Sequence, residues 1–313
     1  MIKTLAKYRN SGWGKAIWLL WTWVLPAVIL VVVVLKFMGD GESLSLLHSV
    51  PVAHKLGIVL CVGLLPLNIG IESWKWKFIL TRMDEKTIWA CTKIILAGKS
   101  LNVISPFGVG DGFSRFIGLS EKYRDQIFAA LAVDRFSQLL PTLMFGTMAV
   151  VYLLNRGLEV PVDVLFLAFL VSTILVLGGV LGLYFYRNGL KKYLFLLSQL
   201  NTSSILKLFL MSTGRYVVFV FQFYFVFWAL GCDLDIITML FGIAWIFLIK
   251  TLLPDLSVLG DLVKREISAT LFFSFFVTDL SVVLLASFLV WLINIVFPAI
   301  LGLFFVSDLK KSF

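Results

Sequence analysis

Apolar segments long enough to form membrane-crossing helices recur along the whole chain, and they restrict its fold more than any other feature. A helix of about twenty residues spans the roughly 30 Å hydrocarbon core of a bilayer, where irregular backbone leaves polar groups unsatisfied. Of the 313 residues, 60% are hydrophobic and only 14% are charged, so no polar stretch remains for a separate soluble domain. We therefore predict one all-α polytopic membrane domain over residues 1–313.

We predict about six full transmembrane helices, at roughly 16–37, 56–73, 127–153, 162–186, 206–230 and 282–306. Two further apolar segments, at about 87–120 and 236–278, are interrupted by proline, glycine and aspartate. The legs that follow these breaks, 112–120 and 266–277, are too short to cross a bilayer as helices. We interpret each segment as a re-entrant helical hairpin that enters and leaves on one side of the membrane.

The distribution of basic residues supports the two hairpins. With them, nearly all lysines and arginines of the loops are cytoplasmic, and only Lys36, Lys55 and Arg156 lie outside. If each segment instead crossed the membrane fully, these residues would divide far more evenly. The count places Lys75 and Trp76 in an interfacial turn on the cytoplasmic side, and it places both termini there as well.

The order of the segments predicts an inverted repeat. Three full helices separate the hairpins, so the hairpins enter from opposite sides, and the two halves lie at about 56–186 and 206–306. Pro141 and Gly146 follow the first hairpin, and Pro298 and Gly302 follow the second at similar offsets. Inverted repeats with broken helices are typical of secondary transporters whose binding site lies near the membrane midplane.

The six-residue pattern Gly-Asp-x-x-x-Arg occurs at 110–115 and again at 260–265. Each copy follows a proline and an apolar helix-length segment, where a charge costs several kcal/mol unless it is paired or hydrated. Basic residues outnumber acidic ones in these segments, which favours a cavity for an anion such as a phosphate. The predicted cavity residues are Asp111, Arg115, Asp134, Arg135, Arg215, Asp261, Arg265, Glu266, Lys99 and Lys250.

Structural explanations remain open for several of these residues. Asp134 and Arg135 are adjacent in one helix and point about 100° apart, so they need separate partners. An interhelical ion pair that fixes the bundle is one alternative, with Arg215 as the candidate partner of Asp134. Lys99 and Lys250 either line the cavity or extend toward an interface.

Glycines in the breaks predict a backbone site for the anion. They prohibit a continuous helix and free backbone amides at the start of the second leg, where a helix N-terminus favours negative charge. The predicted backbone cradle consists of Gly108, Gly110, Gly112 and Gly260. The alternative is a turn in which Asp111 caps the following helix and Arg115 pairs with it.

Several classes of site are not expected. The cysteines Cys61, Cys91 and Cys232 are scattered, and the two histidines share one loop without a carboxylate cluster, so we predict no metal site and no cofactor. The net charge of +9 resides in short juxtamembrane clusters, which favours membrane lipids over nucleic acid as partners. We find no nucleotide-binding or catalytic motif and expect no enzymatic activity.

The run from Pro106 to Arg115, followed by Ala132-Val-Asp-Arg135, resembles the flippase-like transmembrane region of lysylphosphatidylglycerol synthases. The stretch 254–266, which ends in Lys-Arg-Glu, resembles the second Pro/Gly motif of that family but contains less glycine. The resemblance covers essentially the whole chain. It implies movement of aminoacylated phospholipids or related isoprenoid lipids between leaflets, with cavity residues Asp111, Arg115, Asp134, Arg135, Arg265 and Glu266.

We therefore expect a flippase-like transporter in the bacterial inner membrane that moves a phospholipid, including an aminoacylated one, or an isoprenoid-phosphate lipid. The aminoacyltransferase domain of the synthases is missing, so synthesis of an aminoacylated lipid is not expected. One alternative is an integral-membrane transferase for a lipid-linked substrate, with Asp111 and Asp261 as acids. The other is an accessory subunit of an envelope lipid enzyme. A homo-oligomer or a lipid-synthesising enzyme is a further expected partner.

Overall fold

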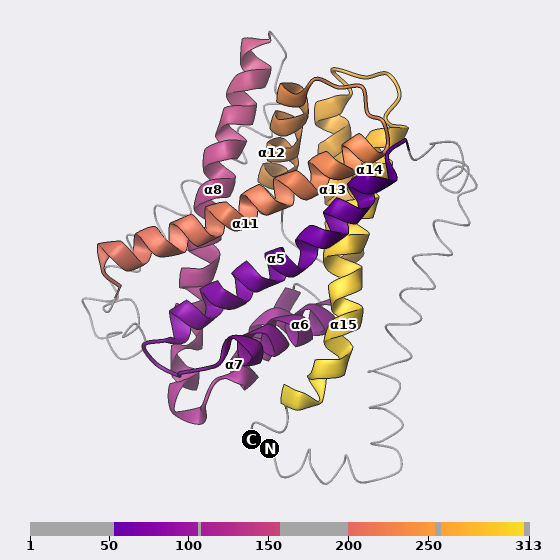
Figure 1. Ribbon diagram of the computed structural model, residues 1–313. Coiled ribbons are helices and arrows are strands. Elements are labelled where there is room, and N and C mark those ends of the chain that lie inside the picture. Colours follow the sequence, from indigo (N-terminus) through magenta and orange to yellow (C-terminus); the bar gives the residue numbers. More distant parts are fainter. Residues whose placement is uncertain (1–52, 106–107, 157–199, 254–257, 310–313) are drawn as a thin grey trace.

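The computed structural model describes residues 53–105, 108–156, 200–253 and 258–309, and every regular element in these ranges is a helix (Figure 1). Four helices are long and apolar enough to cross a membrane: α5 (Lys55–Leu80), η3 with α8 (Glu121–Asn155), α11 (Thr202–Ala229) and α14 through α15 (Ser281–Val306). They confirm the all-α polytopic membrane fold and coincide with four of the predicted spans. The predicted spans 16–37 and 162–186 lie outside the described residues.

Both interrupted segments form helical hairpins. In the first, α6 (Ile88–Ile104) packs against α7 (Val109–Gly118), and in the second, α12 (Ile236–Leu252) packs against α13 (Val258–Phe273). The second legs begin earlier than predicted, so the aspartate of each Gly-Asp-x-x-x-Arg copy lies in the first turn of α7 or α13. The prolines of the two breaks lie outside the described residues.

The break of the first hairpin ends at Gly108, whose left-handed backbone (φ 65°) is one that residues with a side chain rarely adopt. The first amides of α7 are then satisfied from the preceding leg. The backbone N–H of Gly110 donates to Ser105 Oγ at 2.8 Å, and that of Asp111 donates to Asn102 Oδ1 at 2.7 Å. These side chains satisfy helix-terminal amides that would otherwise lack partners.

The packing of the hairpins is reciprocal. The first helix of each hairpin packs against the long helix that follows the other hairpin, α6 on α15 (Phe297–Val306) and α12 on α8 (Ile127–Asn155). Gly146 and Gly302 lie in these contacts: a Cβ on Gly146 would lie 2.7 Å from Leu248 Cβ, and one on Gly302 would meet the carbonyl of Leu96. The two glycines with matching offsets thus occupy corresponding contacts.

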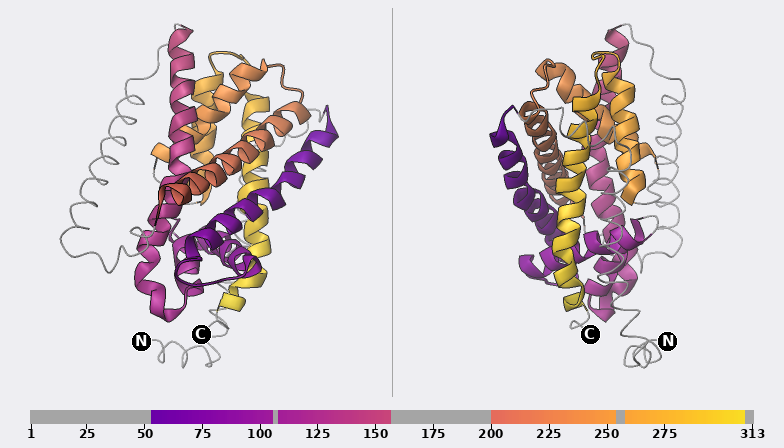
Figure 2. Two further views of the ribbon diagram at one scale, coloured as in Figure 1. Left: turned by 60° about the vertical axis from the view of Figure 1, so that its left-hand side comes forward. Right: turned by 90° about the vertical axis from the view of Figure 1, so that its right-hand side faces the viewer.

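The hairpins lie toward opposite ends of the molecule. Figures 1 and 2 show α6 and α7 near the C-terminal end of α15, whereas α12 and α13 lie beside the start of α14 (Ser281–Trp291). Helices α5 and α11 pack together and cross the bundle obliquely between them. Both hairpins therefore reach the middle of the bundle from different ends.

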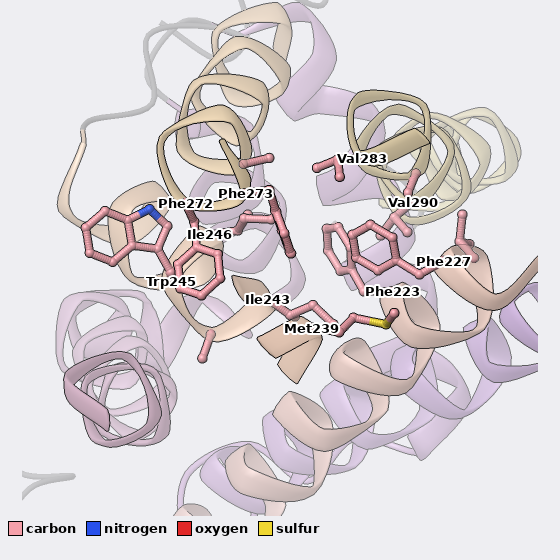
Figure 3. Packing of buried hydrophobic residues seen from close by; sticks show 14 of the residues in the cluster. Phe223, Phe227, Met239, Ile243, Trp245, Ile246, Phe272, Phe273, Val283 and Val290 are labelled. Atoms are coloured by element: carbon pink, nitrogen blue, oxygen red, sulfur yellow. The ribbon is translucent and has the colours of Figure 1, made fainter. Parts of the chain in front are cut away.

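The larger apolar core surrounds the second hairpin (Figure 3). Phe272 and Phe273 of α13 contact each other and the aromatic side chains of neighbouring helices, with Phe273 5.6 Å from the ring of Phe227. The indole N–H of Trp245 donates to the carbonyl of Ser268 at 3.1 Å, which joins α12 to α13. A smaller cluster around Trp76 and Ile95 packs beside the first hairpin.

The last long helix contains a π-helical turn, η5 (Leu292–Val296), between α14 and α15. Its Asn294 is buried, donates from Nδ2 to the carbonyl of Val290 at 3.2 Å, and accepts from Asn68 of α5 at 3.4 Å. Single π-helical turns widen a helix locally and often occur at functional sites. Here the turn directs an amide side chain into the bundle.

Candidate functional site

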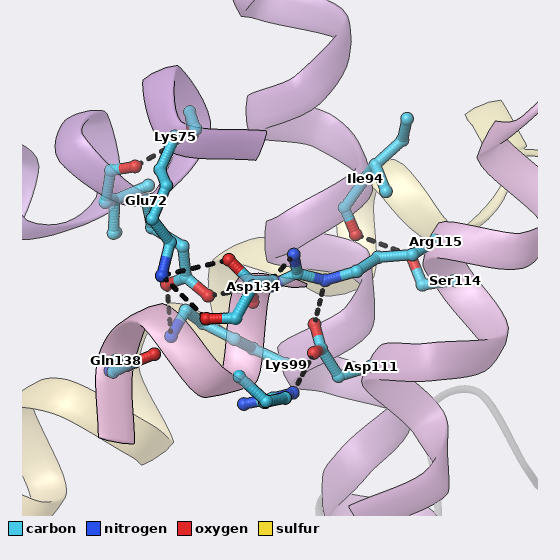
Figure 4. Close-up of polar contacts among 12 residues, drawn as sticks. Glu72, Lys75, Ile94, Lys99, Asp111, Ser114, Arg115, Asp134 and Gln138 are labelled. Carbon is cyan, nitrogen blue, oxygen red and sulfur yellow. Dashed lines mark hydrogen bonds and ion pairs between the residues drawn. The ribbon is translucent and has the colours of Figure 1, made fainter. Parts of the chain in front are cut away.

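Arg115 is the centre of a buried ionic network (Figure 4). Its Nε donates to Asp111 Oδ1 at 3.1 Å, its Nη2 donates to Glu72 Oε1 at 3.1 Å, and its Nη1 lies 3.3 Å from Asp134 Oδ2. The guanidinium is fully buried and lies over the ring of Trp76 at 4.5 Å. One cation therefore joins carboxylates from α5, α7 and α8, which offsets the cost of burying each of them.

Glu72 is the second centre of this network, and we did not include it among the predicted site residues. Besides Arg115, it pairs with Arg215 Nη2 at 2.6 Å and lies 3.4 Å from Lys99 Nζ. A signal for it exists in the sequence, because Asn68 and Glu72 are four residues apart within an apolar helix and share one face. Asn68 in fact accepts a hydrogen bond from Arg215 Nε at 2.9 Å.

Two expectations, the candidate pair of Arg215 with Asp134 and the interfacial turn at Lys75, were wrong. Arg215 does not pair with Asp134; its Nη1 donates instead to Gln138 at 3.1 Å. Lys75 is not in an interfacial turn, because α5 continues to Leu80 and the buried Lys75 ammonium lies 2.9 Å from Asp134. The physical reason is that α5 packs against both α8 and α11. Polar side chains of α5 therefore pair with Asp134 of α8 and with Arg215 of α11, which would otherwise be available to each other.

The prediction of separate partners for Asp134 and Arg135 is confirmed. Asp134 faces Lys75 and Arg115, while Arg135 Nη2 donates to Asp111 Oδ2. The Arg135 side chain remains 58% exposed even though it is paired. It is therefore an accessible cation at the edge of an otherwise buried network.

The second hairpin has a simpler ionic cluster. The two oxygens of Asp261 have different partners, with Lys250 Nζ 3.0 Å from Oδ1 and Arg265 Nε 3.0 Å from Oδ2. Lys264 Nζ donates to the carbonyl of Leu253 at 3.0 Å, just past the end of α12. The Nη1 of Arg265 is buried and has no hydrogen-bond partner in the part of the chain that the structure describes.

A cavity of about 700 Å³ lies between the hairpins and is lined by residues of both. The predicted site residues on its wall are Asp111, Arg135, Arg215, Asp261, Arg265, Lys99, Lys250 and Gly108. Glu72, Gln138, Tyr216 and Asn294 also line it. The wall thus holds five cations and three carboxylates, a positive excess that suits an anionic ligand.

Other predicted residues lie elsewhere. Arg115 and Asp134 are fully buried behind the wall, where they hold its lining residues. Glu266 is partly buried in α13, and it is not on the cavity wall. Gly110, Gly112 and Gly260 do not line the cavity either.

The prediction of a free amide at Gly110 in the backbone cradle is also corrected. The N–H of Gly110 is bonded to Ser105, and a Cβ on this glycine would meet the backbone of Leu101 and Asn102. Gly110 is therefore needed for the close approach of α7 to α6, and it leaves no amide for a ligand. Among the described residues, no group of three potential metal ligands occurs.

The comparisons with known proteins identify a membrane family. The family model described as the lysylphosphatidylglycerol synthase TM region matches residues 20–302, which is most of the chain. Comparison with curated proteins and with solved structures gave no match.

Proposed function

Because the chain belongs to the lysylphosphatidylglycerol synthase TM-region family, we propose that it is a transporter that moves a lipid with an anionic head group between the membrane leaflets. The family supports a function connected with membrane lipids, and the helices support a multi-pass membrane protein. Within this proposal the protein is not an enzyme, it resides in the bacterial inner membrane, and its cargo is a phospholipid or isoprenoid-phosphate lipid.

One observation carries the proposal: a single polar cavity is lined by two hairpins that approach it from opposite ends of the bundle (Figure 2). A head group in such a cavity lies near the membrane midplane and contacts both halves. The lipid tails stay among the exposed apolar side chains, of which the described helices carry many. The protein then needs to move only the polar part of the lipid through a polar environment.

The ion pairs on the wall suggest how the cavity accepts a charged cargo. Asp111 with Arg135 and Asp261 with Lys250 neutralise each other while the cavity holds no cargo. A phosphate that enters competes with these carboxylates for the cations, which lowers the cost of desolvating it. If only one of these two ion pairs breaks at a time, one hairpin is released while the other stays in place. Alternating access requires that the two sides of the cavity do not open together.

The test is lipid translocation in proteoliposomes. Fluorescent phosphatidic acid, phosphatidylglycerol and phosphatidylcholine are placed in both leaflets, and the fraction accessible to an external quencher is followed with time. We expect faster exposure of the anionic lipids than in protein-free vesicles, and slower exposure with Arg135→Gln. Equal rates with and without protein, for every head group, would exclude the proposal.

A further inference from the structure

We propose that the anionic group of the cargo binds to Arg265 at the second hairpin, and that the cavity takes a phosphomonoester or diphosphate head group in preference to a cationic aminoacylated one. This inference rests on the proposed transport function and names the substrate class and the anion subsite.

Arg135 on the cavity wall is exposed, whereas Arg115, Arg215 and Arg265 are buried and differ in how their guanidinium nitrogens are paired. Every nitrogen of Arg115 lies within 3.3 Å of a carboxylate oxygen, although its Nη1 contacts Asp134 as an ion pair without a hydrogen bond. Every nitrogen of Arg215 donates a hydrogen bond, to Asn68, Gln138 or Glu72. Arg265 donates from Nε to Asp261, but its buried Nη1 has no hydrogen-bond partner among residues 53–105, 108–156, 200–253 and 258–309.

An unpartnered N–H of a buried guanidinium is costly, because the charged group has lost water without gaining an acceptor. Arg265 is only 2% exposed and lies on the cavity wall, so its buried Nη1 lies directly behind the surface that an acceptor in the cavity would approach. A phosphate oxygen is the acceptor that matches a guanidinium best in charge and geometry. The second hairpin therefore supplies a buried donor that is left for a ligand, beside the exposed cation Arg135.

Tyr216 supplies a second unpartnered donor on the same wall. It is buried, it lines the cavity, and its hydroxyl has no hydrogen-bond partner among the described residues. The ring is fixed by stacking on Phe145 at 4.9 Å and by an edge contact with Phe247 of α12 at 5.4 Å. Two buried donors beside one cavity, both without acceptors among the described residues, point to a ligand that accepts hydrogen bonds.

The charge of the wall selects the class of head group. Its five cations exceed its three carboxylates by two. A phosphomonoester carries about −1.5 to −2 at pH 7 and neutralises this excess. An aminoacylated head group brings an ammonium ion into the same region, where low dielectric strengthens the repulsion from the arginines and lysines.

The experiment measures binding, separately from transport. The purified full-length chain in uncharged detergent is titrated with dihexanoyl phosphatidic acid, dihexanoyl phosphatidylcholine and a short-chain lysylphosphatidylglycerol, and complexes are counted by native mass spectrometry. We expect phosphatidic acid to bind at least about tenfold more tightly than the other two. Arg265→Gln should weaken its binding about tenfold or more, as loss of a charge-assisted hydrogen bond requires.

Three further variants separate binding from folding. Arg265→Lys keeps the positive charge but lacks the planar set of guanidinium N–H donors, so this variant should bind phosphatidic acid with intermediate affinity. The double variant Asp261→Asn, Arg265→Gln removes both members of the pair, so it should stay folded and still lose binding. Lys93→Gln removes a cation that pairs with Asp308 away from the cavity wall, and its affinity should match the wild type.

Undiminished binding of phosphatidic acid by folded Arg265→Gln would overturn the subsite, and equal affinity for the lysyl lipid would overturn the substrate class. The translocation assay distinguishes these failures from failure of the proposed function. If phosphatidic acid binds through Arg265 but is never moved, transport is wrong and the subsite stands. If it is moved equally well without Arg265, transport stands and the subsite is wrong.

Discussion

The two hairpins carry the same Gly-Asp-x-x-x-Arg pattern, yet they are held in place by different forces. The arginine of the first, Arg115, joins carboxylates from α5, α7 and α8 and has no exposed surface. The arginine of the second, Arg265, pairs among the described residues with just one carboxylate, that of Asp261 in its own helix. The repeated pattern therefore connects helices in one half and leaves donor capacity for a ligand in the other.

Apolar packing shows the reverse difference, since it is more extensive around the second hairpin than around the first. Phe272 and Phe273 anchor the second hairpin in the large aromatic core, and the ring of Phe273 lies against Gly242 of α12 (Figure 3). The first hairpin borders a smaller core cluster. Aromatic packing already fixes the position of the second hairpin, so this hairpin can hold an arginine whose donors are incompletely paired. The first hairpin depends on its ion pairs instead.

Arg115→Gln should have the largest effect and tests this contrast most directly. It leaves three buried carboxylates short of one cation, which should cost about 3–5 kcal/mol of stability. The measurement is thermal unfolding of the purified protein in detergent. Arg265→Gln, its counterpart, should be clearly less destabilising because Asp261 keeps Lys250. Equal losses would remove the proposed division between the hairpins.

Gly242→Ala should be the next largest change and tests the packing of the second hairpin. The added Cβ would lie within 2.8 Å of ring atoms of Phe273, and overpacking of this kind costs about 1–3 kcal/mol. Phe273→Leu in the same chain should recover part of the loss because it makes room. Additive effects of the two substitutions in thermal unfolding would contradict the contact.

Lys99→Gln and Lys250→Gln compare the equivalent lysines of α6 and α12. Each side chain is partly exposed, so each substitution should change stability by less than about 1 kcal/mol. Binding of phosphatidic acid should fall more with Lys250→Gln, which removes a cation beside the Arg265 subsite. A greater loss with Lys99→Gln would move the anion to the first hairpin.

The smallest expected effect concerns the N-terminal caps of α12 and α6, the first helices of the two hairpins. The stability that these two caps contribute should depend on pH to different degrees. Asp235 caps α12, and its hydrogen bonds to Thr238 and to the N–H of Ile237 lower the pKa of its carboxyl group. A lowered folded-state pKa stabilises the fold above the unfolded value near about 4 and ceases to do so as pH falls through the folded value. Thr87 caps α6 and does not titrate.

The unfolding temperatures of Asp235→Ala and Thr87→Ala, each compared with the wild type at neutral and at acidic pH, measure this difference. The deficit of Asp235→Ala should shrink in acid, while that of Thr87→Ala should stay constant. A deficit of Asp235→Ala that is the same at both pH values would show that the carboxylate form has no advantage as a cap.

The sequence was sufficient to predict those parts of the fold that depend on local physics. Segment length and hydrophobicity identified the long helices, and the breaks around Gly108 and Gly260 identified both hairpins. The partners of the buried charged side chains could not be predicted from the sequence in the same way. The pairing of Lys75 with Asp134 depends on α5 packing against α8, and an aromatic and basic run at 74–78 is equally typical of an interface.

The site shows the same division. Asp111, Arg135, Asp261 and Arg265, which charges in apolar segments marked as candidates, line one cavity, and their role in binding a substrate stays a prediction. The free amide of Gly110 was predicted wrongly because Ser105, on the preceding leg, already accepts from it. A sequence shows which donors a break releases, but only the packed hairpin shows which side chains have returned to bond them.

The π-helical turn η5 sets the rotational register of the last helix. It lies between α14, which packs on α11, and α15, whose Gly302 admits α6. Each residue rotates an α-helix by about 100°, so loss of a single residue from this turn would swing Gly302 away from α6. The chain therefore tolerates substitutions in η5 more readily than a change in its length.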